Sequence, residues 1–116
     1  MSDEYLPPPP PRGLKDAGTA LWTDAVAEVE FEPHFLQLLG EAAKTLDTLQ
    51  VLQSVLDADG PIIHSPQGTK AHPALSELRQ GRITLARLLA ALKIPPADDE
   101  PIKARAPRGV YGMRGA

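Results

Sequence analysis

The sequence predicts an all-α protein, in which a short N-terminal helix precedes a long antiparallel helical hairpin with a small β-like excursion at its tip. Two runs, 33–59 and 73–93, favour this fold because their apolar residues recur at steps of four and three, which places them on one helix face. Gly60-Pro61 stops the first run, and two helices joined by a short connection fold back on each other.

The first helix is expected over residues 15–30. Its apolar face comprises Leu21, Trp22, Ala25, Val26 and Val29, which recur at helical spacing. We expect Trp22, the chain's single tryptophan, to anchor this helix against the hairpin, because aromatic side chains bury a large area. The acidic residues around its end are interpreted as a solvated edge: Glu28, Glu30 and Glu32.

Two glycines, Gly18 and Gly40, lie inside predicted helices, where each carries a penalty of about 1 kcal/mol. Gly40 is either a tolerated residue or a point of close approach by another chain. Pro33 and Pro73 suit the first turns of the two long helices, where a missing N–H costs nothing. The connection at 60–72, with Ile62-Ile63 and then Ser65-Pro66-Gln67-Gly68, predicts a small β-hairpin or an Ω-type excursion.

The two ends of the chain differ from this helical domain, which is assigned to residues 14–96. Residues 1–13 include five consecutive prolines, Pro7–Pro11, and are expected to form a disordered arm whose polyproline II rod is a spacer or, alternatively, docks in a partner's aromatic groove. Residues 97–116 are expected to be a flexible basic tail. Residues 15–100, by contrast, hold 13 acidic and 7 basic side chains.

Few side chains suggest catalysis or metal binding. The absence of cysteine excludes disulfides and thiolate metal sites, and His34, His64 and His72 lack the spacing of metal ligands. No phosphate-cradling loop is present. We therefore expect no enzyme activity, metal or cofactor. The short apolar runs and the absence of a secretory signal predict a cytoplasmic protein without a membrane span.

Cations on the last helix and in the tail are candidates for contact with nucleic acid. Arg79 and Arg82 are neighbours on a helix surface and can present guanidinium groups to phosphates. Position 82 also falls in the apolar rhythm of the hairpin, so an Arg82–Asp47 ion pair is an open structural alternative. The full set of candidate DNA contacts is Lys70, Arg79, Arg82, Lys103, Arg105, Arg108 and Arg114.

Apolar positions along the helices are expected to form the core and the contacts between copies of the chain. A small hairpin buries limited apolar area, and self-association is a common way to bury more. The residues assigned to this role are Trp22, Leu39, Leu46, Leu49, Leu56, Leu78, Leu85 and Leu89.

An ordered set of features now suggests a family: Gly18…Trp22, the helix ending at Asp59-Gly60, the excursion closing on Gly68, the sequence HPAL at 72–75, and Leu88-Leu89…Leu92…Pro95. Residues 14–96 thereby resemble the small subunit of phage terminases. The resemblance implies a non-catalytic, homo-oligomeric ring in the host cell cytoplasm. Such a ring binds double-stranded viral DNA and delivers it to the large terminase subunit, which holds the ATPase and the nuclease.

The chain departs from many small terminases, which carry a separate helix-turn-helix DNA-binding domain before the oligomerisation region. Only one helix is predicted before residue 33, so DNA contact is expected at ring surfaces, helix ends or the basic tail, mostly through phosphates. Two other readings remain open. The chain is alternatively a helical protein-binding adaptor, or an antitoxin-like small regulator that forms an obligate dimer.

Overall fold

The computed structural model describes residues 4–94, and within them the chain is mostly helical with one small two-stranded sheet. The elements in chain order are α1 (Asp16–Glu28), α2 (Pro33–Asp59), β1 (Ile62–Ser65), β2 (Gly68–Ala71) and α3 (Pro73–Ala91). The helical class is confirmed, α2 has the predicted bounds, and the excursion is a β-hairpin.

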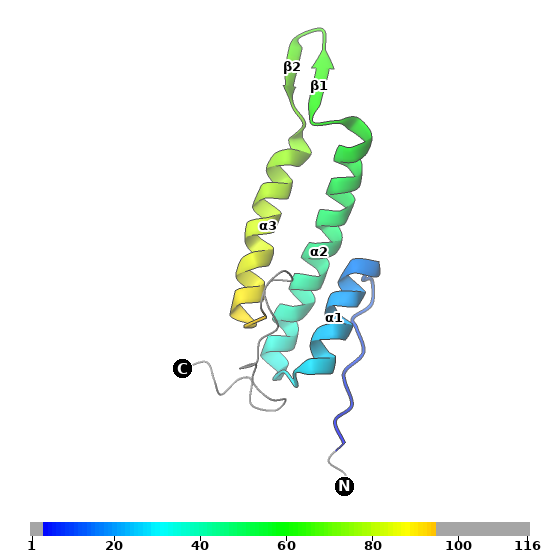
Figure 1. Cartoon of the computed structure of the whole chain (residues 1–116), viewed down its shortest axis with the longest axis vertical. Helices are drawn as coiled ribbons and strands as arrows, with labels where there is room; N and C mark the ends of the chain where they lie inside the picture. The colour runs from blue at the N-terminus through cyan, green and yellow to red at the C-terminus, as the bar shows by residue number, and fades with distance from the viewer. Residues whose placement is uncertain (1–3, 95–116) are drawn as a thin grey trace.

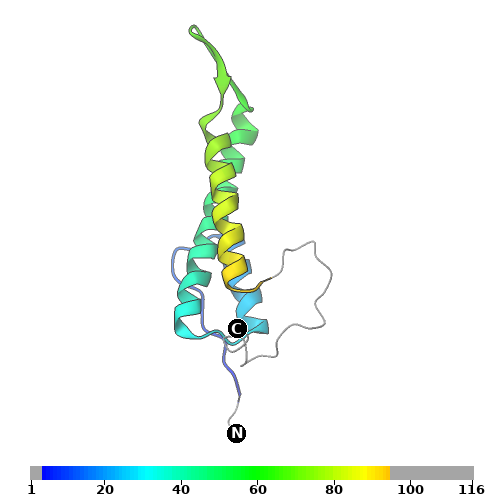
Figure 2. The same ribbon diagram turned by 90° about the vertical axis from the view of Figure 1, so that its left-hand side faces the viewer.

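The longest helix, α2, is the axis of the molecule. It extends over about 40 Å, and α3 runs beside it in the opposite direction (Figures 1 and 2). The strands β1 and β2 project beyond the far end of both helices and pair antiparallel, from Ile62 opposite Ala71 to Ser65 opposite Gly68. In contrast, α1 packs only beside the lower half of α2 (Figure 1).

Local chemistry sets the two ends of α2. Pro33 occupies the first turn, and the backbone N–H groups of Phe35 and Leu36 donate to the carbonyl of Glu32. Gly60 follows the last turn with φ of +82°, and its N–H donates to the carbonyl of Leu56 at 2.7 Å. A glycine suits this position because other residues rarely adopt positive φ.

The first helix ends two residues earlier than the sequence predicts. After Glu28 the backbone becomes extended at Val29, and side chains then alternate between the core and solvent. Val29 and Phe31 are buried, whereas Glu30 and Glu32 are exposed. The acidic residues form a solvated edge as predicted, while Phe31 between them belongs to the core.

Packing is uneven along the molecule. The main apolar cluster lies at the lower end, where three helices meet, and consists of Trp22, Val26, Val29, Phe31, Leu39, Ala42 and Leu92. Between this cluster and the β-hairpin, α2 and α3 bury Leu49, Ala74 and Leu78. The lower half is therefore a three-helix core, and the upper half is a pair of helices.

The sequence predicts a disordered arm that acts as a spacer, whereas the described part of the proline-rich arm, from residue 4, packs against the helical domain. Tyr5, Pro8 and Pro11 are half-buried, while the positions between them are exposed. This spacing of three is the period of polyproline II. The indole N–H of Trp22 donates to the carbonyl of Pro8 at 3.0 Å, and the Tyr5 hydroxyl donates to the carbonyl of Val26 at 3.0 Å. The rod thus docks on the aromatic residue of its own α1.

Candidate self-association and nucleic-acid interface

Large apolar side chains are exposed on both long helices, at the level where α1 begins and above it. Val51 and Val55 on α2 retain 47% and 40% of their accessible surface, and Ile83 on α3 retains 43%. Because α1 begins level with Asp47, nothing within residues 4–94 continues its packing above that point. Val51 and Val55 are neighbours on one face of α2, and adjoining exposed apolar side chains are a feature of protein interfaces.

The eight residues assigned to the core and to self-association divide into two groups. Trp22, Leu39, Leu49 and Leu78 are buried within the single chain. The remaining four are only half-buried: Leu46, Leu56, Leu85 and Leu89. The second group faces the seam between α2 and α3, so a single chain leaves part of its own seam accessible to water.

Three of the seven candidate DNA-contacting cations lie on described elements. Lys70 is exposed on β2 at the tip, and Arg79 and Arg82 are exposed on α3 one turn apart. The tail residues Lys103, Arg105, Arg108 and Arg114 lie outside the described residues. The structure therefore brings Arg79 and Arg82 together, and it places Lys70 apart from them at the tip.

The alternative of an Arg82–Asp47 ion pair is wrong. The Nη2 group of Arg82 donates to Gln53 Oε1 at 3.1 Å across the two long helices. Asp47 points instead toward α1, where its carboxylate accepts from the backbone N–H of Lys15 at 2.6 Å and of Gly18 at 2.7 Å. The first N–H groups of a helix have no partner within the helix, and the Lys15 side chain has no oxygen to accept from them. The Asp47 carboxylate, which is distant in the sequence, accepts these hydrogen bonds instead.

This contact also gives Gly18 a role that sequence reasoning missed. Gly18 is buried, and a Cβ there would overlap the Asp47 carboxylate and lie 2.6 Å from the Ala43 carbonyl oxygen. The close approach of α1 to α2 therefore requires glycine. The sequence does not show that Asp47 is buried, and it is this burial that requires hydrogen-bond donors for the carboxylate.

Gly40 contacts its own chain. A Cβ at this position would lie 3.9 Å from both the Pro11 ring and the Trp22 ring, an ordinary contact distance. The described structure thus gives no reason to assign Gly40 to another copy. Gly81 on α3 is tighter, since a Cβ there would lie 2.5 Å from the end of the Leu49 side chain.

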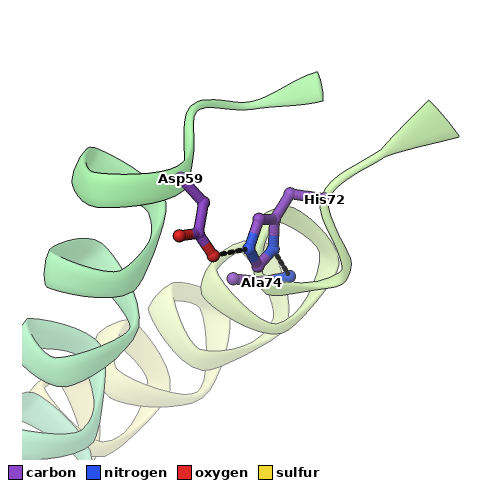
Figure 3. Close-up of polar contacts among 3 residues, drawn as sticks. All are labelled: Asp59, His72 and Ala74. Carbon is purple, nitrogen blue, oxygen red and sulfur yellow. Dashed lines mark hydrogen bonds and ion pairs between the residues drawn. The ribbon is translucent and has the colours of Figure 1, made fainter. Parts of the chain in front are cut away.

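A polar clasp closes the upper end of the helix pair (Figure 3). His72 precedes α3, and its Nδ1 accepts from the backbone N–H of Ala74 at 3.0 Å. Its Nε2 lies 2.9 Å from Asp59 Oδ2 at the end of α2. Because Nδ1 accepts a hydrogen bond, the ring proton lies on Nε2 and donates to Asp59. The histidine is therefore a structural cap that joins two helices.

Neither metal ligation nor membrane insertion is indicated over residues 4–94. These residues contain no group of three or more histidine, aspartate or glutamate side chains placed to hold a metal ion. No helix among them is long and apolar enough to cross a bilayer.

Comparisons with known proteins add no relative. No family model, curated protein or solved structure matches this chain. The case for a function therefore depends on the chain's own surfaces and on the sequence features described above.

Proposed function

We propose that this chain is the non-catalytic small subunit of a phage terminase, acting in the host cytoplasm. In this role, copies of the chain assemble as a ring, bind double-stranded viral DNA, and deliver it to the large subunit that cuts and translocates it. The observation that carries the proposal is the exposure of large apolar side chains on both long helices, at Val51, Val55 and Ile83.

Self-association is the simplest way to cover this surface. Complete burial of one valine or isoleucine side chain is worth about 1.5–3 kcal/mol relative to exposure. Among residues 4–94, the two-helix region buries the apolar residues Leu49, Ala74 and Leu78, so contacts with neighbouring copies would add a large fraction to its core. Repetition of one such contact around an axis produces a ring.

DNA binding by the proposed assembly would depend on phosphate contacts. Lys70 at the exposed tip and the four tail cations are repeated in every copy of a ring, which multiplies a modest local charge. Phosphate contacts release counterions, so affinity falls as salt concentration rises. The many acidic side chains between residues 15 and 100 disfavour wrapping of DNA around the body.

Truncation after Glu100 tests this assignment. The truncated protein is expected to bind linear double-stranded DNA more weakly and with a shallower dependence on salt, because four phosphate-binding cations per copy are lost. Fluorescence anisotropy across a salt series measures both quantities, and Lys70→Ala in the full chain is the matched single-site comparison. If neither variant changes binding, the tail and the tip are not the DNA contacts.

Pull-down by the large terminase subunit tests delivery. The full chain is expected to be retained, and the truncated chain distinguishes a tail that docks on the large subunit from one that contacts DNA. If the full chain binds neither DNA nor the large subunit, the proposal is wrong. A stable dimer without either activity would favour an antitoxin-like regulator.

A further inference from the structure

We infer that the proline rod of the N-terminal arm is presented to a second protein while it remains docked on α1. A polyproline II helix has three residues per turn and therefore three edges. One of them, the docked edge, faces the body at Tyr5, Pro8 and Pro11. The partner that fits the rod is a protein groove lined with aromatic side chains and carrying an acidic residue at one end. The rod offers this partner its two exposed edges, the outer edges, which consist of Leu6, Pro7, Pro9, Pro10 and Arg12.

The body holds the rod by its docked edge. The indole N–H of Trp22 donates to the carbonyl of Pro8 at 3.0 Å, and the Tyr5 hydroxyl donates to the carbonyl of Val26 at 3.0 Å. Leu6 lies between these two anchors and retains 80% of its accessible surface. The arm runs alongside α1 at the edge of the molecule (Figure 1), and within the described residues its outer edges face solvent.

An aromatic groove is the complementary surface for such a rod. Proline has no backbone N–H, so the rod offers a partner only proline rings and carbonyl acceptors. Aromatic side chains supply apolar surface for the rings, and tryptophan and tyrosine also supply donors for the carbonyls. SH3 and WW domains bind polyproline II ligands in aromatic-lined grooves. Trp22 already makes a contact of this kind with Pro8, and the outer edges offer the same groups to a second aromatic surface.

The outer edges contain proline at positions that docking does not use. Of the five consecutive prolines, only Pro8 and Pro11 lie on the docked edge. Pro7 and Pro10 lie three residues apart on one outer edge, which is the Pro-x-x-Pro spacing that SH3 domains bind. Because the body already orders the rod, little conformational entropy is lost when a partner binds it. Docking therefore prepares the rod for a partner.

Charges at its two ends give the rod a direction. Glu4 precedes the rod and Arg12 follows it, and both side chains are exposed. Within residues 4–94, Arg12 forms no ion pair. An acidic residue at the corresponding end of a partner's groove would pair with Arg12, and this pairing selects one of the two orientations in which the groove can lie along the rod.

Titration of the full-length chain with an isolated SH3 domain that selects Pro-x-x-Pro-x-Arg tests the inference. Calorimetry measures the affinity, and a synthetic peptide of residues 4–13 is the reference ligand. The chain is expected to bind at least as tightly as the peptide, because its outer edges are exposed and its rod is already ordered.

Substitutions locate the contact on the chain. Pro7→Ala with Pro10→Ala is expected to weaken SH3 binding at least about tenfold, and Arg12→Glu is expected to weaken it at least about fivefold. Pro66→Ala and Arg79→Glu are the matched controls, because they replace an exposed proline and an exposed arginine outside the arm. Both controls are expected to retain the affinity of the native chain.

The indole N–H of Trp22 reports whether the rod stays docked. Trp22 is the chain's single tryptophan, so its indole gives one identifiable signal in the nuclear magnetic resonance spectrum of the isotope-labelled chain. Pro8→Ala with Pro11→Ala supplies the position of this signal when the rod is undocked. In the saturated SH3 complex, the signal is expected to keep the position that it has in the native chain.

Each other outcome overturns the inference. If neither the chain nor the peptide binds, the rod is not a ligand for an aromatic groove. If only the peptide binds, the body hides the rod. If the chain binds but the Trp22 signal moves to its undocked position, the partner takes the docked edge. If Pro7→Ala with Pro10→Ala leaves the affinity unchanged, the contact lies elsewhere. None of these results bears on the proposed ring, which is tested by its mass.

Discussion

The backbone N–H groups at the start of α1 are capped by a carboxylate from another helix. Asp47 is buried and accepts hydrogen bonds from the N–H groups of Lys15 and Gly18, which lie 32 and 29 residues away in the chain. Hydrogen bonds to a charged group contribute about 1.5–3 kcal/mol each. Gly18 permits this arrangement because it has no side chain at the contact.

Substitution of Gly18 by alanine tests this contact. The added Cβ would displace the Asp47 carboxylate and the backbone of α2 near Ala43, so we expect the free energy of unfolding to fall by about 2–4 kcal/mol. Chemical denaturation of the full chain measures the change. Gly40→Ala is the matched control, since its Cβ has room and gains about 1 kcal/mol of helix propensity. Equal effects of the two substitutions would refute the role assigned to Gly18.

At the scale of single elements, the N-terminal arm behaves as a ligand of its own domain. Tyr5, Pro8 and Pro11 face the body, and the two intervening positions in each step face solvent. Trp22 is only 5% exposed, covered in part by this rod. A rigid polyproline segment loses little conformational entropy when it docks, so few contacts suffice to hold it.

Paired proline substitutions distinguish the docked edge of the arm from its exposed edge. Pro8→Ala with Pro11→Ala is expected to lower stability by about 1–2 kcal/mol and to red-shift the fluorescence of Trp22, because two half-buried proline rings are lost from the segment that accepts the hydrogen bond of the indole N–H. Pro7→Ala with Pro10→Ala removes two exposed prolines and is expected to leave the Trp22 emission unchanged. Identical spectra for the two double variants would show that the arm does not cover the tryptophan.

The helices were predictable because their signals are local. Pro33, Gly60 and Pro73 mark where the long helices begin and end, and the apolar steps between them define the buried faces. The docking of the arm on Trp22 and the capping of α1 by Asp47 join segments far apart in the chain, which periodicity does not describe. The Arg82–Asp47 pair was an alternative because position 82 falls in the apolar rhythm of the hairpin, whereas the Asp47 carboxylate faces α1 and Arg82 bonds Gln53.

At the scale of the whole molecule, the three-helix lower half and the two-helix upper half differ in how much apolar surface a single chain buries. The lower half buries an aromatic and aliphatic cluster within one chain. The pair of long helices leaves Val51 and Val55 of α2 and Ile83 of α3 exposed. The sequence predicts self-association, but the eight residues assigned to it lie largely in the single-chain core or seam. Val51 and Val55 lie outside the apolar rhythm from which the assigned residues were chosen.

The mass of the native full-length chain in solution, measured by light scattering over a range of protein concentrations, tests the central claim of self-assembly most directly. We predict one closed species with many copies, whose mass stays constant as concentration rises because no free face remains. A folded monomer at every concentration would contradict the account.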